Sequence, residues 1–194
     1  MSAFASAFAL VVGHEGGLTL DQADPGNWTG GRPGQGTCRG TKYGISAAAY
    51  PDIDIASLTV DQAGDIYRRD YWDRVAGDSL PPPLALLVFD AAVNNGVARA
   101  TEWLQQAAGT EPDGVIGPAT TKAVQRVAQT QGGAALCAEF LARRMSFMAS
   151  LPTWRIFGLG WARRLCSLPY QSVAMADGDQ DARGGRAPVA IRCG

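Results

Sequence analysis

The sequence lacks the residues that would indicate a metal centre or a disulfide-rich fold. It contains one histidine, and its four cysteines, at positions 38, 137, 166 and 193, show no C-x-x-C spacing. These residues form neither a zinc-ligand pattern nor a dense disulfide framework, so we expect free thiols, no bound metal and no cofactor. A Cys137–Cys166 bridge stays open, because a disulfide depends on geometry that spacing does not show.

Strong charge and long apolar runs are also missing. The formal net charge is −1 and the hydrophobic fraction is 46%, which argues against a strongly basic nucleic-acid-binding protein and against wholesale disorder. No run reaches the roughly 18 apolar residues of a membrane span. Residues 3–12 are apolar, but no Lys or Arg precedes them, so we expect no cleaved signal peptide.

The first periodic segment predicts a helix that carries an acidic residue at its end. Four apolar side chains recur at helical spacing: Phe4, Phe8, Val11 and Val12. Glu15 lies about three turns after Phe4, so its carboxylate projects from the same apolar face. Gly16 and Gly17 then allow the helix to end and the chain to turn sharply. Partial desolvation there would raise the pKa of Glu15, as a general acid requires.

The rest of the chain predicts an irregular segment followed by several helices, and hence an all-α fold. Residues 18–44 are rich in Gly, Pro, Asp, Asn and Thr, and long loops of this kind are usually functional. A capping box at Thr59–Gln62 predicts a helix to about residue 75. Further helices are expected over residues 84–94, 97–108 and 134–150, and a turn at residues 113–120 leads into another.

Two later features leave alternatives open. Asp90 interrupts an apolar helix, so it either bonds to a neighbouring helix or faces a cleft. Residues 154–165 alternate aromatic residues with arginines, which is typical of packed tryptophans with solvated arginines but also suits contact with an anionic polymer or a lipid surface. Residues 169–194 are rich in small and polar residues without periodicity, and we expect a disordered tail.

Three stretches together resemble the catalytic region of glycoside hydrolase family 108, a family of N-acetylmuramidases. They are His14-Glu15-Gly16-Gly17, Asp24-Pro25-Gly26 and Thr41-Lys42-Tyr43-Gly44-Ile45-Ser46, which follow the family wording E-G-G-Y, D-P-x-D-x-G-G and T-N-x-G-I-[ST]. The D-G-x-x-G-x-x-T wording of residues 113–120 is similar to that of small peptidoglycan-binding modules. One departure is Leu18, which stands where the family has an aromatic residue.

The resemblance implies a lysozyme-like helical fold with a long irregular active-site loop. Residues 1–80 would form the catalytic region, and residues 81–168 a helical region with a predicted peptidoglycan-binding segment packed on the first. Its substrate would be the β-1,4 bond between N-acetylmuramic acid and N-acetylglucosamine in a peptidoglycan strand. No nucleic-acid partner is expected, and the chain would act as a monomer.

The resemblance also assigns roles to residues. Glu15 would be the general acid, and Asp24 and Thr41 would hold or activate the attacking water, by analogy with phage-type lysozymes. Asp21 is the rival second carboxylate, and an aspartate before Pro-Gly can also be a simple turn former. Residues expected to contact the glycan are Asp21, Trp28, Tyr43 and Tyr71. For Trp28, packing beneath the loop is the equal alternative to stacking on a sugar.

Two other functions remain compatible with the sequence. A lytic transglycosylase would need no second carboxylate, because the sugar's own 6-hydroxyl attacks. A non-catalytic wall-binding or secretion-assisting protein is the alternative from another class. A chain made in the cytoplasm without a signal peptide would reach the periplasmic cell wall with outside help, such as a holin. The context that this favours is an endolysin of a phage or gene-transfer particle, or a wall-remodelling lysozyme.

Overall fold

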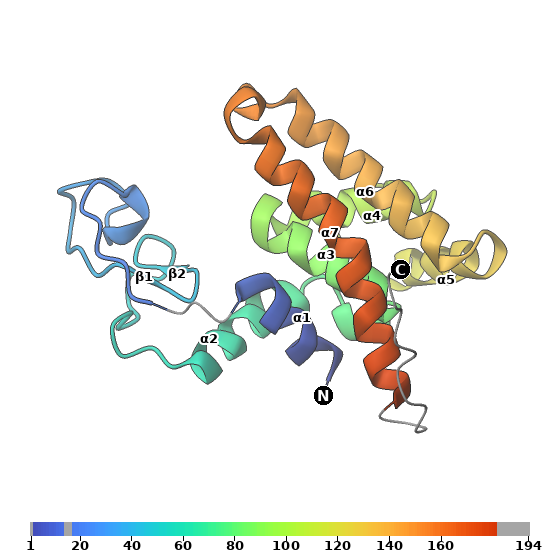
Figure 1. Ribbon diagram of the computed structural model, residues 1–194, viewed down its shortest axis with the longest axis horizontal. Coiled ribbons are helices and arrows are strands. Elements are labelled where there is room, and N and C mark those ends of the chain that lie inside the picture. Colours follow the sequence, from blue (N-terminus) through green and yellow to red (C-terminus); the bar gives the residue numbers. More distant parts are fainter. Residues whose placement is uncertain (1, 14–16, 182–194) are drawn as a thin grey trace, which may run out of the picture. The chain divides into compact units, whose positions relative to one another are not determined.

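The computed structural model describes residues 2–13 and 17–181, with side chains as far as residue 172. Its described part is mainly helical, which confirms the all-α expectation (Figure 1). The α-helices are α1 (Ala3–Val12), α2 (Val60–Tyr67), α3 (Pro82–Asn95), α4 (Val97–Ala107), α5 (Pro118–Thr130), α6 (Gly133–Ser150) and α7 (Trp154–Asp181). The strands β1 (Thr41–Lys42) and β2 (Ile45–Ser46) form a two-stranded sheet. No described helix is both long and apolar enough to cross a bilayer.

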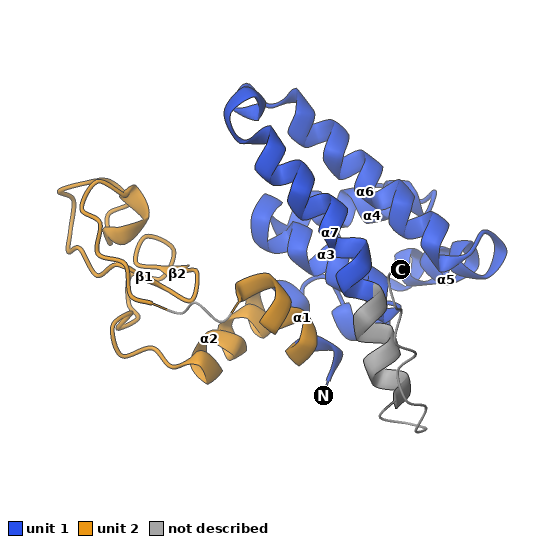
Figure 2. Cartoon of the chain, viewed as in Figure 1, with its two compact units in different colours: residues 1–4, 71–194 blue, residues 5–70 orange. Residues whose placement is uncertain are grey.

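The chain divides into two compact units (Figure 2). Residues 5–70 form one, which we call the loop unit because most of it lies outside regular secondary structure. Residues 1–4 and 71–194 form the other, which we call the helical unit. The boundary near residue 70 falls before the division at residue 80 that the sequence predicts, and that division stays a prediction.

In the loop unit, α2 begins as the sequence predicts. The Thr59 hydroxyl accepts from the Gln62 N–H, and the Gln62 side chain accepts from the Thr59 N–H, which completes the capping box. The α-helical geometry ends at Tyr67 and continues as a π-helical segment over Arg68–Trp72, so the regular helix is shorter than expected. The Tyr67 ring is buried and packs edge-on against Phe8 of α1, with centroids 5.5 Å apart. This contact ties α1 to α2.

The helical unit is organised around α3. Nine consecutive residues of this helix, Leu84 to Ala92, are buried, because α4, α6 and α7 all pack against it. Trp72 is fully buried, and its ring lies 5.5 Å from those of Phe4 and Phe89. Its indole N–H donates to Asp78 at 3.0 Å. An apolar helix that is covered all round is the expected central element of a helical domain.

Asp90 resolves the alternative that the sequence left open, since it bonds to neighbouring helices. It is fully buried, and its carboxylate accepts from Arg144 Nη1 of α6 at 2.6 Å and from Arg164 Nε of α7 at 2.9 Å. Arg144 Nε donates in turn to Asn95 Oδ1 at 2.8 Å. One carboxylate therefore joins three helices through two guanidinium groups.

The last helix continues beyond the point at which the sequence predicts a disordered tail. α7 runs to Asp181, so residues 169–181 are helical, while residues 182–194 lie outside the described part. Leu165, Leu168 and Ser172 are buried, which holds the helix against α3 and α6 past Pro169. Composition gave no sign of this packing, because the stretch from residue 169 is rich in small and polar residues without periodicity.

Candidate active site

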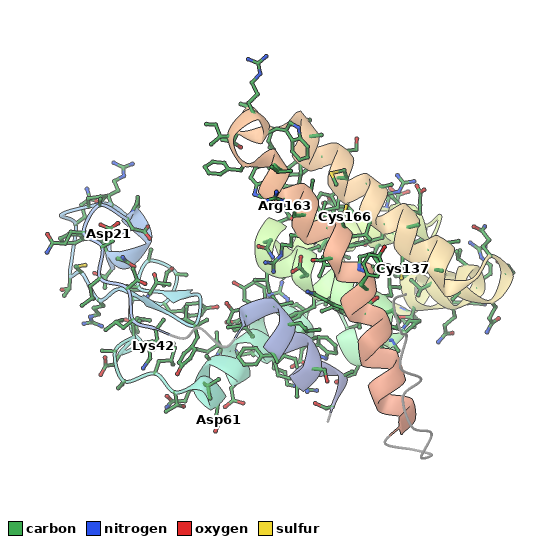
Figure 3. All side chains as sticks on the ribbon, viewed as in Figure 1. Asp21, Lys42, Asp61, Cys137, Arg163 and Cys166 are labelled. Atoms are coloured by element: carbon green, nitrogen blue, oxygen red, sulfur yellow. The ribbon has the colours of Figure 1, made fainter. Side chains whose placement is uncertain are left out.

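The predicted general acid, Glu15, lies outside the described residues, together with His14 and Gly16. α1 ends at Val12, and Gly13 has a φ of 74°, in the left-handed region in which the chain leaves a helix. The candidate site is therefore built from the described residues that follow, 17–58 of the loop unit. Figure 3 marks two positions within this segment, Asp21 and Lys42.

A tight hairpin forms one side of this segment. β1 and β2 pair antiparallel, with Thr41 opposite Ser46, and are joined by the two residues Tyr43 and Gly44. Both have positive φ, 52° and 74°, which is the geometry of a type I′ turn. A Cβ on Gly44 would stand 2.4 Å from Tyr67 Oη, so glycine is needed for space as well as for conformation. The T-K-Y-G-I-S motif thus specifies a turn.

Tyr67 connects this hairpin to the helices of the loop unit. Its hydroxyl donates to the Tyr43 carbonyl at 3.1 Å, while its ring packs on Phe8. On the other edge, Thr19 and Thr41 exchange two backbone hydrogen bonds, at 2.9 and 3.0 Å. The chain that follows Gly17 is thereby fixed beside the strand that carries Thr41.

Asn27 is the buried polar centre of the irregular segment. Its side chain is fully buried, its amide nitrogen donates to the Asp21 carbonyl at 2.9 Å, and its Oδ1 accepts from the Thr41 hydroxyl at 2.7 Å. Its backbone carbonyl accepts from the N–H groups of Arg39 and Gly40 at 2.9 and 3.1 Å. One residue therefore brings together Asp21, Thr41 and the end of the loop, the first two through its side chain and the last through its backbone carbonyl.

The two candidate second carboxylates both cap local turns. Asp24 precedes the 3-10 turn Pro25–Asn27, and its Oδ1 accepts from the Gly26 N–H at 2.8 Å. Asp21 Oδ1 accepts from the Ala23 N–H at 2.9 Å. Both residues are exposed, and within the described residues neither carboxylate has another partner. Each therefore keeps one oxygen available to water or ligand.

The predicted aromatic contacts lie in different surroundings. Trp28 is half-buried, and its indole N–H donates to the Gln22 carbonyl at 3.0 Å, so it closes the base of the loop. Tyr43 is half-buried at the hairpin turn, with Lys42 Nζ 5.5 Å from its ring centroid. Tyr71 is half-buried but belongs to the helical unit. The structure thus places Trp28 and Tyr43 in the loop unit with the two aspartates.

An open depression of about 510 Å³ lies on the loop unit. Its lining residues are Leu18, Leu20, Cys38, Arg39, Asp52, Asp54 and Ala56. Leu18 and Leu20 are 39% and 53% exposed, and Arg39 donates to the Pro51 carbonyl at 2.9 Å. Hydrogen bonding from Ser57 lowers the pKa of Asp54, so this wall is anionic at neutral pH. The depression combines apolar surface with charges of both signs.

The polar groups of the D-G-x-x-G motif form hydrogen bonds within the helical unit. Gln105 of α4 is buried, and its amide nitrogen donates to Asp113 Oδ1 at 2.6 Å, to the Val115 carbonyl and to the Thr120 hydroxyl. Its amide oxygen, Oε1, accepts from the Gly114 N–H at 2.9 Å. The polar groups of this motif therefore shape the turn before α5.

Sequence reasoning missed Asn27 and the structural role of Tyr67. Asn27 reads as one more turn residue after Pro-Gly, and its burial depends on partners as far away as Thr41. Tyr67 lies within the helix that the sequence predicts after Thr59, but its hydroxyl contact with Tyr43 spans 24 residues of chain. The only sequence signal for that hydrogen bond is a tyrosine on the predicted helix together with a Tyr-Gly turn earlier in the chain.

Comparisons with known proteins identify two family segments in this chain and one similar solved structure. Residues 8–96 match the family model described as Glycosyl hydrolase 108, and residues 99–166 match the one described as Predicted Peptidoglycan domain. Among solved structures, the one titled "Structure of Brucella abortus SagA" has 33% sequence identity and a TM-score of 0.70. The similarity covers 88% of this chain and 94% of that one. No curated protein matches the chain.

Proposed function

We propose that this chain, which belongs to the glycosyl hydrolase 108 family, is an N-acetylmuramidase that cleaves the β-1,4 bond between N-acetylmuramic acid and N-acetylglucosamine. The chain is a glycoside hydrolase, and its second family match makes peptidoglycan the substrate. The observation that supports a muramidase in particular is the set of hydrogen bonds made by the buried Asn27 side chain. These bonds hold Thr41 and the Asp21 turn in the segment that directly follows Glu15.

In the proposed mechanism, Glu15 protonates the bridging oxygen while positive charge develops at the sugar carbon. A carboxylate opposite the leaving group, Asp24 or Asp21, orients the attacking water, and the product anomer is inverted. Such a pair should stand roughly 6.5–9.5 Å apart, rather than the roughly 5 Å of a retaining pair. No metal or cofactor takes part in these steps.

The hydrogen bonds of the loop support these roles. Thr41 uses its hydroxyl hydrogen in the bond to Asn27, so towards a water or a sugar hydroxyl its oxygen can only accept. Asp21 and Asp24 each have one oxygen in a backbone hydrogen bond and one available. A water molecule shared by a threonine oxygen and a carboxylate oxygen would direct its lone pair towards the sugar carbon.

For glycan binding, we propose Trp28, Tyr43, Tyr71 and Asp21, together with the depression that Leu18 lines. Leu18 is exposed where the family has an aromatic residue, so this chain offers less stacking surface there. Leu18→Tyr should therefore lower the KM for peptidoglycan fragments and leave kcat largely unchanged. An unchanged KM would remove Leu18 from the binding surface.

A second candidate is a lytic transglycosylase. The observation that favours it is that both aspartates act as turn caps, a role that accounts for them without catalysis. In that reaction the 6-hydroxyl of the muramic acid attacks its own C1, and a 1,6-anhydro product forms without water. Mass spectrometry of digested peptidoglycan separates the two, because hydrolysis adds the mass of one water to each cut strand.

The test of the proposal is a set of carboxylate variants assayed on purified peptidoglycan. Glu15→Gln should reduce turnover by about 10³-fold or more, as expected for loss of a general acid in a glycosidase. Asp24→Asn and Asp21→Asn should differ, and the larger loss identifies the second carboxylate. Asp61→Asn, an exposed aspartate of α2, is the matched control. A fully active Glu15→Gln variant would show that Glu15 is not the general acid, whereas a wild-type chain without turnover would leave the non-catalytic wall-binding function.

We further infer that the chain acts as a monomer on the periplasmic wall, as an endolysin or a wall-remodelling lysozyme. The exit route would be a holin or an equivalent pore. Expression in a Gram-negative host tests this: the chain alone should leave the cells intact, and its expression with a holin should lyse them. Lysis without a holin would contradict the proposed dependence on a pore.

A further inference from the structure

The first turns of α7 expose a cluster of large apolar side chains. Ile156, Phe157 and Leu159 are 75%, 52% and 66% exposed, although they lie within four consecutive residues. α6 and α7 run as a hairpin, and in Figure 1 their connection projects beyond the other helices of the helical unit. Concentrated exposed apolar surface of this kind usually marks an interaction site.

The cluster stands on a rigid aromatic base. The Trp161 ring lies 6.1 Å from that of Trp154 and 5.9 Å from that of Phe157. Gly158 is buried beneath the Trp154 indole, and a Cβ there would stand 2.6 Å from the ring. The tryptophans are therefore turned inwards against the helix, and the side chains presented outwards are mainly aliphatic.

Two arginines lie on the face of the helix that carries Ile156 and Leu159, while Phe157 lies about 100° further round, next to Trp161. At about 100° per residue, Arg155, Ile156, Leu159 and Arg163 fall within an arc of about 100°. Arg155 and Arg163 are exposed and form no ion pair within the described residues; Figure 3 labels Arg163 on α7. The sequence contains no acidic residue between Glu139 and Asp177, so no carboxylate offsets these charges locally.

We propose that this face, residues 154–163, docks on an anionic lipid bilayer. Aliphatic side chains can enter the acyl region while the arginines on either side reach the lipid phosphates, which is the arrangement of an interfacial helix. A glycan would require outward aromatic faces and hydrogen-bonding groups, whereas the tryptophans here face the helix. A docking partner of acidic protein is less favoured, because the exposed centre of the patch is purely apolar.

The experiment uses the full chain and sedimentation with vesicles of phosphatidylethanolamine and phosphatidylglycerol, compared with phosphatidylcholine vesicles. The wild type should bind the anionic vesicles, and Ile156→Ser/Phe157→Ser/Leu159→Ser should lower the partition coefficient by about tenfold or more. Arg155→Gln/Arg163→Gln should lower it by about fivefold or more and remove its salt dependence. Val115→Ser, at a residue 67% exposed on the same unit, should change nothing.

The proposal would be overturned if the wild type did not bind anionic vesicles, or if the triple variant bound them as well as the wild type does. It would also be overturned if the triple variant kept vesicle binding but lost binding to sacculi or self-association. Circular dichroism melts of each variant confirm that it is folded. Because the triple variant should keep wild-type activity on soluble glycan fragments and Glu15→Gln should keep vesicle binding, failure of this proposal is distinguishable from failure of the proposed function.

Discussion

The loop unit and the helical unit each bury a polar residue that joins several segments, Asn27 and Asp90, and these two residues bond in different ways. In the loop unit the buried residue is neutral: the Asn27 side-chain amide bonds to the Asp21 carbonyl and the Thr41 hydroxyl, and its backbone carbonyl accepts from two N–H groups of the irregular chain. In the helical unit it is a carboxylate, Asp90, held by two guanidinium groups among apolar helices. The amide shapes a loop that would otherwise lack regular hydrogen bonding, whereas the charges lock helices that already share a core.

The two family-matched segments also differ in charge. Residues 8–96 contain six basic and eleven acidic side chains, a formal net charge of −5, and residues 99–166 contain eight basic and four acidic, a net charge of +4. A basic segment complements the carboxylates of peptidoglycan stem peptides. The formal net charge of the whole chain, −1, does not show this difference between the two segments.

The largest predicted effect on stability concerns the charged centre of the helical unit. Asp90→Asn leaves Arg144 and Arg164 without their carboxylate in a buried site, and should cost about 3–5 kcal/mol of unfolding free energy. Burial already lowers the pKa of Arg144, and one of its nitrogens, Nη2, has no partner in the described structure. Chemical denaturation measures the loss, and hydrogen exchange should locate it in α3, α6 and α7.

Glu139→Gln is the control for that experiment. Glu139 pairs with Arg143 at 2.6 Å in a partly exposed i,i+4 bridge, which should contribute no more than about 0.5 kcal/mol. If the Asp90 and Glu139 variants lost similar stability, the charged centre would not be what locks the helices. Faster exchange in residues 17–58 of the Asp90 variant would contradict the assignment of the effect to one unit.

Loss of the Asn27 side chain should affect activity more than global stability. Asn27→Ala leaves the Thr41 hydroxyl without its acceptor and frees the Asp21 turn, at a cost of about 1–3 kcal/mol. Because misplaced catalytic groups lose rate steeply, turnover on peptidoglycan should fall by about 10²-fold. Gln22→Ala, in the same loop, is the control, since only the Gln22 backbone carbonyl is bonded to Trp28. Wild-type turnover in Asn27→Ala would contradict the proposed role.

The hairpin offers a smaller effect and a test of coupling. Gly44→Ala should cost about 1–3 kcal/mol, because φ is positive and the new Cβ would collide with the Tyr67 hydroxyl. Tyr67→Phe alone loses the hydrogen bond to the Tyr43 carbonyl, about 1 kcal/mol. In the double variant the collision is absent, so the combined loss should be smaller than the sum. Strict additivity in thermal unfolding would show that the φ angle alone requires glycine.

These contrasts show what the sequence can predict. Local signals correctly predicted the capping box at Thr59, the helix that follows the turn at residues 113–120 and the helical content, because they depend on neighbours along the chain. They failed where a distant partner decides the outcome. The Asn27–Thr41 bond spans 14 residues and the Asp90–Arg164 bond spans 74.

The candidate site was predictable in part for the same reason. Family wording supplied the order of Glu15, Asp24 and Thr41, and the turn-capping alternative for Asp24 follows from local chemistry. The hydrogen bond that positions Thr41 does not, because nothing around Asn27 distinguishes it from a solvent-exposed turn residue. The π-helical segment after Tyr67 was likewise absent from the periodicity, since a single wide turn changes the spacing by one residue.

The smallest predicted effect compares acid sensitivity in the two units. Hydrogen bonding from Gln105 lowers the pKa of Asp113 in the helical unit, and hydrogen bonding from Ser57 lowers that of Asp54 in the loop unit. A folded-state pKa below the unfolded value gives stability that is present above the ordinary pKa, near 4, and is lost as pH falls through the folded value. Asp113→Asn and Asp54→Asn should each flatten the decline of Tm below pH 4, slightly, because both groups are exposed. The control Asp61→Asn removes another exposed carboxylate. If Tm fell with pH in the same way in all three variants, these hydrogen bonds would not favour the charged form of Asp113 or Asp54.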